Sequence, residues 1–327
     1  MAQGSLVPVF ERNEFKGYVV YDAVFPSVQL GQSTLTVFSS SFAVLEPDVD
    51  TAIIDATLSV GESKPAGFRV TCNGVTITRE FKPLMCVERN EVGGRICRVV
   101  YDITPIVRSK PASTITIAVE NYGMSTITLE HLAVTVLYKK SNARTNIRQY
   151  GGVLVLEPGE AVRLPPLEGP APLEARIVAY VPPGSWLTVG GRKSRGAGFA
   201  VYDFSLGGTN TFEIGYMGRS DVFPRDALVA SVLLVRGIVP RPVIDASARR
   251  IGSDRVEVRV KNTGSAPVDK LIVVALNKGL VVDRKVVDSI APSREEVIEL
   301  KASSEPVIVR VIWRELNELK LKEFRIQ

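Results

Sequence analysis

The side chains that could perform chemistry in this chain are few and widely separated. His131 is the only histidine among 327 residues, so a catalytic triad or a metal site cannot draw on a second imidazole. It lies in the apolar segment LEHLAV, where a packed or edge histidine is the expected role. No nucleophile elbow, Walker loop or dinucleotide fingerprint occurs. We therefore expect no enzyme, although carboxylate pairs that meet only in the fold leave glycosidase chemistry open.

Three carboxylates, Glu46, Asp48 and Asp50, crowd the turn EPDVD. Oxygen ligands at this density could coordinate calcium, which would be the one cofactor of the chain. Acidic turns are also commonly solvated without any metal, and both interpretations remain open.

A glycine-rich stretch, GGRKSRGAG, carries Arg192, Lys193 and Arg195. Its backbone amides and the three cations could cradle an anionic ligand. A long hairpin loop would produce the same composition, so the stretch predicts either an anion site or a simple connection.

Cys86 and Cys97 flank the segment VERNEVGGRI, whose paired glycines indicate a hairpin turn. Facing positions on such a hairpin could form a disulfide, or the two thiols could simply be buried. Cys72 is the third cysteine. The spacing of these three does not fit zinc, which favours paired C-x-x-C ligands.

The elements that position these residues are organised by an internal repeat. The stretch from Arg98 to Gly123 is matched by the stretch from Phe199 to Gly218, and both contain an apolar strand followed by Tyr-Asp. Tyr101-Asp102 corresponds to Tyr202-Asp203. We interpret the pairs as structural corners, in which the aspartate turns the chain and the ring is buried, rather than as ligand sites.

Alternating and β-branched segments separated by Gly, Pro and Asn turns predict an all-β protein. LEARIVAYV (173–181) matches TAIIDATLSV (51–60), and the segment from Trp186 to Gly191 matches that from Phe68 to Gly74. We expect a jelly-roll sandwich over 1–140, a shorter copy over 150–236, and an immunoglobulin-like sandwich over 243–327. The tail LKLKEFRI alternates and is predicted to be a strand.

Two resemblances accompany this organisation. The patterns RVTCNG, VVYDIT and ITIAVENYG resemble galactose-binding-like jelly-roll modules, which implies a non-catalytic domain that binds carbohydrate or packs against neighbours. The patterns KNTGSAPV and IAPS resemble CARDB-type immunoglobulin-like domains, which implies a surface-adhesion role.

Composition narrows the class of protein. Hydrophobic residues make up 45% and charged residues 23%, as in a folded globular chain. The net charge of +5 is spread diffusely, so we do not expect nucleic acid as a partner. No apolar run is long enough for a membrane span, and the N-terminus lacks a signal-peptide core. We therefore expect a cell-surface or virion location if a leader was removed or export is atypical, and a cytoplasmic location otherwise. Abundant Arg and loop Pro with scarce Gln suggest a thermophilic, archaeal-like source.

Two functions remain. The first is a structural, assembly or adhesion protein of a surface layer, appendage or virion, with protein partners or self-assembly. The second is a carbohydrate-binding protein or accessory module of a glycosidase. Sugar binding normally needs an exposed ring, and both Trp186 and Trp313 lie in predicted strands, which favours core positions and the first function.

The apolar segment SLVPVF, Ser5 to Phe10, precedes the first predicted sandwich. We expect this arm either to dock on another domain or subunit or to remain a frayed or self-paired terminus. Pro8 lacks a backbone donor, which would confine such a strand to the edge of a sheet.

Overall fold

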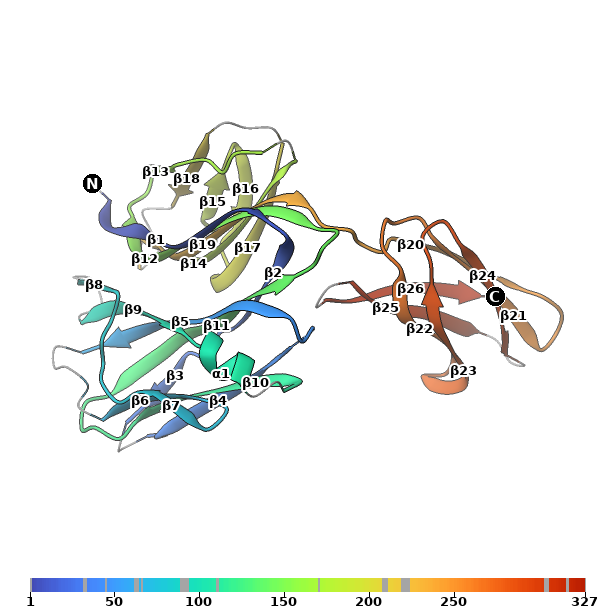
Figure 1. The fold of residues 1–327 in the computed structure, drawn as a ribbon, viewed down its shortest axis with the longest axis horizontal. Coiled ribbons are helices and arrows are strands. Elements are labelled where there is room, and N and C mark those ends of the chain that lie inside the picture. The colour runs from blue at the N-terminus through green and yellow to red at the C-terminus, as the bar shows by residue number, and fades with distance from the viewer. Residues whose placement is uncertain are drawn as a thin grey trace. The chain divides into compact units, whose positions relative to one another are not determined.

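The computed structural model describes residues 2–31, 34–44, 46–61, 65, 67–88, 94–109, 112–169, 171–207, 211–218, 224–302, 306–315 and 318–326. They form two compact units, residues 1–239 and 240–327 (Figure 1). Strands dominate both units, which confirms the all-β fold class. The described part of the chain has one helix, α1 (Thr104–Ser109), and no helix there is long and apolar enough to cross a membrane.

The first sandwich has one sheet in the order β4-β10-β6-β7 and another in the order β2-β11-β5-β9-β8, with β3 also paired to β11. Its strands are β2 (Gly17–Val24), β3 (Val28–Leu30), β4 (Val37–Ala43), β5 (Val49–Val60), β6 (Phe68–Cys72), β7 (Val75–Thr78), β8 (Met85–Glu88), β9 (Arg95–Asp102), β10 (Thr114–Asn121) and β11 (Ile127–Lys139).

The second sandwich has sheets in the orders β13-β18-β15-β16 and β1-β12-β19-β14-β17. Its strands are β1 (Gln3–Phe15), β12 (Arg144–Leu156), β13 (Ala161–Leu164), β14 (Leu173–Val181), β15 (Trp186–Val189), β16 (Arg192–Arg195), β17 (Gly198–Leu206), β18 (Phe212–Met217) and β19 (Ala227–Ile238).

The two sandwiches share one strand plan, as the internal repeat predicts. The order β4-β10-β6-β7 matches β13-β18-β15-β16, and β2-β11-β5-β9 matches β12-β19-β14-β17. Tyr101 of β9 lies opposite Ile54 of β5, and Tyr202 of β17 lies opposite Ile177 of β14, so each tyrosine is on the corresponding strand of its sandwich. The hairpin register also corrects one detail of the sequence match: Cys72 and Val189 each precede a two-residue turn, and three residues before them lie Arg69 and Trp186, so Trp186 corresponds to Arg69 rather than to Phe68.

The larger sheets of the two sandwiches pack against each other (Figure 1). Ala133 and Leu137 of β11 share an apolar cluster with Val178 of β14 and Leu228 of β19. Both faces of these central sheets are therefore buried, one inside its own sandwich and one between the sandwiches. This double burial explains why their strands read as nearly continuous apolar runs instead of alternating ones.

The N-terminal arm docks on the second sandwich. Strand β1 pairs with β12 over Gln3 to Phe15 and forms the edge of that sheet. The register shifts between Pro8 and Phe10, as expected where proline cannot donate to the ladder. Leu6 packs against the core of the second sandwich. The structure thus confirms docking on another domain of the chain, and residues 3–15 belong to the second sandwich's sheet.

The C-terminal unit has sheets in the orders β20-β21-β24 and β23-β22-β25-β26. Trp313 is buried in its core, and the tail is a strand, as predicted. Asn262 of the KNTG motif is fully buried and its amide donates to the carbonyls of Ala266 and Ile290, which fixes the turn. The strands are β20 (Ile244–Arg250), β21 (Arg255–Asn262), β22 (Val268–Asn277), β23 (Leu280–Ile290), β24 (Glu295–Lys301), β25 (Val307–Glu315) and β26 (Glu318–Ile326).

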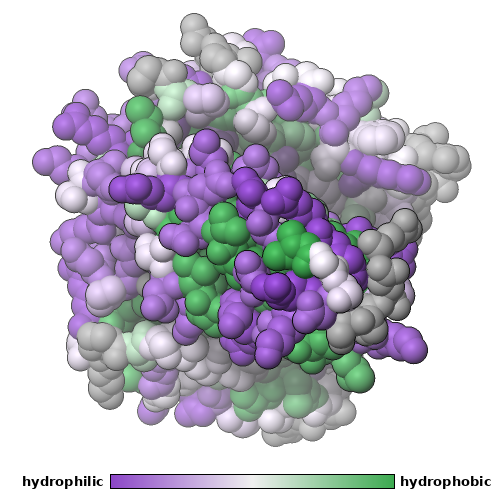
Figure 2. Space-filling view, turned by 90° about the vertical axis from the view of Figure 1, so that its right-hand side faces the viewer, coloured by the Kyte–Doolittle hydropathy of each residue, from purple (hydrophilic) through white to green (hydrophobic). Residues whose placement is uncertain are grey.

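The surface is not uniformly polar. The face drawn in Figure 2 carries apolar side chains in groups among hydrophilic ones. Single exposed apolar residues are normal on a folded protein, whereas aligned groups indicate contact surfaces.

Deletion of residues 1–12 should destabilise residues 1–239 selectively. The deletion removes the β1–β12 ladder and the packing of Leu6, which we expect to lower the free energy of unfolding by about 2 kcal/mol or more. Calorimetry of the full and shortened chains measures this change, and the transition of residues 240–327 is the internal control. Unchanged melting of residues 1–239 would contradict a stabilising role of the arm.

Candidate ligand-binding site

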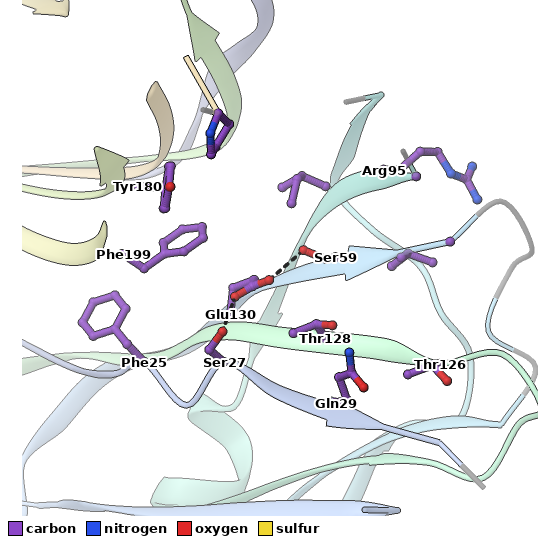
Figure 3. Close-up of a pocket in the computed structure, with 15 residues that line it drawn as sticks. Phe25, Ser27, Gln29, Ser59, Arg95, Thr126, Thr128, Glu130, Tyr180 and Phe199 are labelled. Carbon is purple, nitrogen blue, oxygen red and sulfur yellow. Dashed lines mark hydrogen bonds between the residues drawn. The ribbon is translucent and has the colours of Figure 1, made fainter. Parts of the chain in front are cut away.

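A cavity of about 790 Å³ opens where the two sandwiches of residues 1–239 meet (Figure 3). Its walls come from segments far apart in the sequence, and aromatic rings gather at one end while polar side chains, together with a few aliphatic residues, line the rest. The lining residues are Phe25, Ser27, Gln29, Ser59, Val60, Gly61, Gly94, Arg95, Ile96, Thr126, Thr128, Glu130, Tyr180, Phe199 and Pro224.

The polar floor is a row of side chains that crosses the larger sheet of the first sandwich. Thr128 of β11 lies opposite Gln29 of β3 on one side and Ser59 of β5 on the other. Directly opposed residues of antiparallel strands share one face of the sheet, so all three point to the same side. The next strand continues the row with Ile96, which is buried.

Glu130 follows Thr128 by two residues on β11, so alternation brings it to the same cavity-facing side, and the strand bulges directly after it. The register with β5 shifts between Leu129 and His131, which leaves Glu130 as the extra residue. The bulge places Glu130 and His131 on the same face although they are consecutive. The Glu130 carboxylate accepts hydrogen bonds from Ser27 Oγ at 3.0 Å and Ser59 Oγ at 2.9 Å. Figure 3 shows this carboxylate between the aromatic end and the polar floor.

The aromatic end joins both sandwiches. Tyr180 and Phe199 lie opposite each other on β14 and β17, with ring centroids 5.5 Å apart. Phe25 comes from the first sandwich, and its ring centroid lies 5.4 Å from that of His131. All three rings are half-buried, so one surface of each remains available to the cavity.

Beside Phe25, a charged network is buried between the sandwiches. Arg98 and His131 are 0% exposed and Asp55 is 1% exposed. The Arg98 guanidinium forms an ion pair with Asp55 at 2.7 Å and donates to Thr57 Oγ1 at 2.8 Å. Burial of a charge is costly unless it is paired, and here each of the two charges has the other as its ion-pair partner.

The hydrogen bonds define the tautomer of His131. Arg98 can only donate, so His131 Nδ1 accepts from it at 3.0 Å. Nε2 then carries the proton and donates to the Tyr21 hydroxyl at 2.9 Å. Burial and the nearby Arg98 charge lower the pKa of His131 well below its usual value, which agrees with a neutral ring. Burial also raises the pKa of Tyr21.

The network extends into the second sandwich. Gln149 Nε2 of β12 donates to Asp55 Oδ2 at 2.8 Å, and Arg176 of β14 donates to the Tyr21 carbonyl at 2.9 Å. Burial raises the pKa of Asp55, and the Arg98 charge opposes that rise. These contacts hold the two sandwiches in one orientation and thereby position the rings of the cavity.

The acidic turn faces cations instead of converging on one point. Glu46 accepts from Tyr18 and Lys140, at 2.9 and 3.0 Å. Asp50 lies within 4.0 Å of cationic groups on three side chains, namely Arg12, Arg108 and Lys139. Among the residues that the structure describes, Asp48 included, no group of three acidic, histidine or cysteine side chains could hold a metal ion.

The glycine-rich stretch forms a hairpin. Residues 192–195 are strand β16, which pairs with β15 after the turn at Gly190-Gly191. Lys193 and Arg195 lie opposite Thr188 and Trp186, whereas Arg192 lies opposite the buried Val189. The structure therefore brings Lys193 and Arg195 to one face and places Arg192 on the other.

The tryptophans differ from the expectation that both are core residues. Trp313 is buried, but Trp186 is 40% exposed, so the expectation is wrong for Trp186. Leu187 and Val189 point into the sandwich, and alternation along β15 turns Trp186 outward. Membership of a strand did not indicate which face the ring occupies.

Cys86 and Cys97 are directly opposite on β8 and β9, their Cα atoms are 4.0 Å apart, and they form a disulfide. Cys72 is a buried free thiol. Gly93 of the connecting turn lies outside the described residues, whereas Gly94 adopts a positive φ of 78°.

The Tyr-Asp pairs make structural contacts. Asp102 Oδ1 accepts from the Thr104 backbone amide at 2.8 Å, which is the expected turn. Asp203 instead forms an ion pair with Arg176 at 2.7 Å. The Tyr202 hydroxyl accepts from the Ala197 amide and donates to the Gly198 carbonyl.

Comparison with known proteins gives only a weak likeness of fold. No family model and no curated protein matches the chain. Solved structures with partial similarity include a calcium-binding mutant of Bacteroides uniformis beta-glucuronidase 2, at 11% identity and a TM-score of 0.22. Others are Ruminococcus gnavus beta-glucuronidase, at 11% and 0.22, and Parabacteroides merdae beta-glucuronidase, at 10% and 0.23. Each match covers 55% of this chain and 26%, 35% and 28% of the respective enzyme, so the chain spans about a third of their length or less.

Replacement His131→Gln should flatten the pH dependence of stability below neutrality. The folded protein holds His131 neutral, whereas the unfolded histidine takes up a proton below about pH 6.5. Stability is therefore lost as pH falls, by about 1 kcal/mol between pH 6.5 and 5.5. Asp55, whose pKa is raised, acts in the opposite direction, but it is present in both proteins.

Denaturant unfolding of the full chain at pH 7.5, 6.5 and 5.5 measures the difference. His131 is the only histidine, so no other imidazole contributes. Parallel pH profiles for the wild type and His131→Gln would show that His131 is not the titrating group.

Proposed function

We propose that residues 1–239 bind a carbohydrate in the cavity between the two sandwiches. The observation that carries this proposal is the pairing of three aromatic rings with a row of hydrogen-bonding side chains in one cavity. A saccharide has the same two aspects, since its ring presents apolar C–H groups on its faces and hydroxyls around its edge.

The rings at the aromatic end suit the apolar face of a sugar. Phe25, Tyr180 and Phe199 offer flat surfaces whose burial by a ligand is favourable. Tyr180 and Phe199 are held by each other and Phe25 by His131, so their positions need little adjustment on binding.

The polar floor, together with the neighbouring Thr126 and Glu130, can form hydrogen bonds with the hydroxyl groups at the edge of a sugar ring. Gln29 can donate and accept, Thr126 and Thr128 can do both through their hydroxyls, and Glu130 accepts. Ser27 and Ser59 orient the Glu130 carboxylate, which fixes one acceptor in place. A few placed polar groups within a partly apolar cavity are the usual source of ligand specificity.

The proposal is for binding without hydrolysis. A glycosidase uses two carboxyl groups on either side of the scissile bond. Glu130 is engaged on each oxygen by a serine, an arrangement that suits an acceptor held in place for a ligand hydroxyl. The resemblance of the first sandwich to galactose-binding-like modules agrees with a binding role.

A glycan array probed with the full chain tests the proposal. We expect the wild type to retain a defined set of oligosaccharides and Thr128→Trp, which fills the cavity, to lose them. Gln29→Ala should weaken binding about five- to tenfold through loss of one hydrogen bond.

Thr76→Trp is the matched control, because Thr76 is an exposed strand threonine in the other sheet of the first sandwich. Retention of no glycan by the wild type, or equal retention by Thr128→Trp, would overturn the proposal. Release of reducing ends from a bound glycan would overturn its non-catalytic part.

Self-assembly through the C-terminal unit is a second candidate function. The outer face of the sheet β23-β22-β25-β26 carries an apolar row formed by Val286, Ile272, Ile312 and Leu321 in register. Val286 is 44% and Leu321 is 52% exposed. An apolar row is complementary to a second copy of itself, so we propose that two chains associate by this face.

Sedimentation of the full chain across a concentration series tests this candidate. The double variant Val286→Lys, Leu321→Lys should remain monomeric where the wild type associates. Val297→Lys is the control, because Val297 is 52% exposed on β24 in the other sheet of this unit. A wild type that stays monomeric at every concentration would eliminate the candidate.

A further inference from the structure

We infer that the outer face of the sheet β13-β18-β15-β16 is a second, separate binding surface, for an acidic polysaccharide that stacks on Trp186 and pairs with Lys193 and Arg195. This inference concerns different residues from the cavity and does not depend on the cavity's function.

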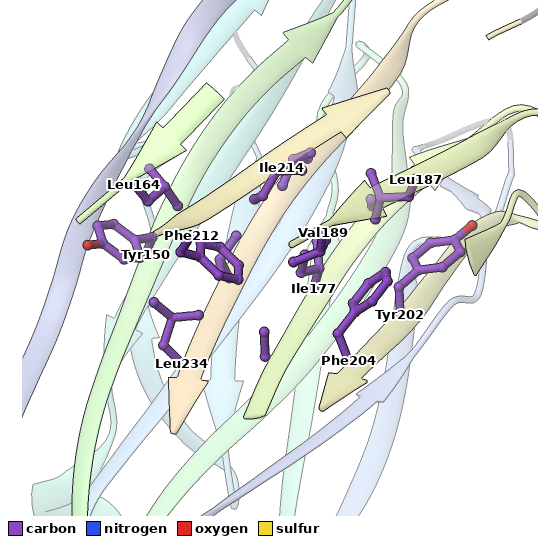
Figure 4. Packing of buried hydrophobic residues seen from close by; sticks show 14 of the residues in the cluster. Tyr150, Leu164, Ile177, Leu187, Val189, Tyr202, Phe204, Phe212, Ile214 and Leu234 are labelled. Atoms are coloured by element: carbon purple, nitrogen blue, oxygen red, sulfur yellow. The ribbon is translucent and has the colours of Figure 1, made fainter. Parts of the chain in front are cut away.

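The register of the sheet identifies the residues that share this face. Leu187 and Val189 of β15 and Phe212 and Ile214 of β18 point into the core (Figure 4). Their neighbours along each strand therefore point outward. Opposed residues form three rows across the sheet: Met217–Trp186–Arg195, then Ala161–Gly215–Thr188–Lys193, then Arg163–Glu213.

The first row is an exposed apolar platform. Trp186 is 40% and Met217 is 47% exposed, and the two lie directly opposite each other. Two large apolar side chains held side by side in water gain free energy when a ligand covers them. A tryptophan ring also offers the flat surface on which a sugar ring can lie.

The residues of the second row have small side chains, so the sheet surface next to the Trp186 ring is flat and open. Ala161, Gly215 and Thr188 are small, and a Cβ atom on Gly215 would lie 2.5 Å from Thr188 Oγ1. A larger residue at Gly215 would displace Thr188. The flat strip thus leaves room for a chain that runs across the strands next to Trp186.

The first sandwich provides an internal comparison. Its equivalent of Trp186 is Arg69 and its equivalent of Met217 is Glu120. Arg69 and Glu120 form an ion pair, and the Tyr122 hydroxyl also donates to Glu120 at 2.6 Å. In the first sandwich the two side chains at this place pair with each other, whereas in the second sandwich Trp186 and Met217 expose apolar surface to solvent.

The charge of the face favours an acidic ligand. Lys193 and Arg195 flank the platform on β16, about 7 Å apart along the strand. In the described part of the chain neither makes an ion pair within 4.0 Å, whereas Arg163 is paired with Glu213 at 2.6 Å. Two available cations beside a ring match carboxylates carried on successive sugars.

The same features favour a polysaccharide over nucleic acid. Strong binding to a phosphate backbone draws on many cations, and this face offers two together with the Glu213 carboxylate. Stacking on one ring with hydroxyls near Thr188 and Glu213 requires no such charge density.

Affinity electrophoresis of the full chain in gels containing polygalacturonate tests the inference. We expect the wild type to be retarded, and the double variant Trp186→Arg, Met217→Glu to bind at least about tenfold more weakly. This variant installs the ion pair that the first sandwich already carries at the same place, so it should fold. Lys193→Ala and Arg195→Ala should each weaken retardation, and Arg192→Ala should not, because Arg192 lies on the other face.

Other outcomes decide against the inference. Hydroxyethyl cellulose is a polysaccharide without carboxylates. If it retarded the wild type as strongly as polygalacturonate does, the ligand would not need acidic groups and the inference would be wrong. Retardation by polygalacturonate that survives Trp186→Arg, Met217→Glu would show non-specific attraction to a basic chain. Trp186-dependent binding of single-stranded DNA without binding of polygalacturonate would assign the face to nucleic acid. Thr128→Trp should leave polygalacturonate binding unchanged, so failure at the cavity and failure at this face are distinguishable.

Discussion

The buried ion pair between Arg98 and Asp55 is the interaction on which the arrangement of residues 1–239 depends. Neither charge reaches water, so each needs the other, and leaving one alone would cost several kcal/mol. Because Asp55 also accepts from Gln149, the pair is satisfied only when the second sandwich is docked in one register. Apolar contact between two sheets tolerates sliding, whereas a buried polar network does not, and this difference gives the interface a single geometry.

The ligand cavity is a consequence of that geometry. Its aromatic end needs Tyr180 and Phe199 from the second sandwich to stand opposite Phe25 and Glu130 from the first. His131 links the two regions, since one side of its ring contacts Phe25 and its nitrogens bind Arg98 and Tyr21. A change in the network should therefore alter the cavity even though no member of the network lines it.

The sequence supports much of the architecture and little of the site. Repeated Tyr-Asp strands, turn residues and alternation were enough to predict an all-β chain with a duplicated sandwich and a strand at the C-terminus. The cavity could not be predicted, because Gln29, Ser59, Thr128 and Phe199 come from strands whose partners only the fold defines. The place of His131 was hidden by a bulge, since regular alternation would put His131 on the face opposite Glu130.

The exposure of Trp186 also could not be predicted from the sequence, because it depends on the register of its strand. Its place in a predicted strand led us to expect a core ring, but in the hairpin register Trp186 corresponds to Arg69, one residue from the buried Phe68, and a one-residue shift in a strand reverses the face.

Because the sandwich is duplicated, each sheet face of the first sandwich has a counterpart in the second, and the counterparts have different surroundings. The two inner-facing large sheets cover each other, so both remain apolar and neither is free to bind a ligand alone. Among the described residues of 1–239, no second sheet covers the two smaller sheets, and their outer faces have diverged: Arg69 pairs with Glu120 in the first, whereas Trp186 and Met217 are exposed in the second. Glu120 is only 5% exposed and also accepts from the Tyr122 hydroxyl, so the first copy closes this part of its surface with its own side chains. A duplicated sandwich can thus acquire a binding face on one copy while the other copy and the shared interface preserve the fold.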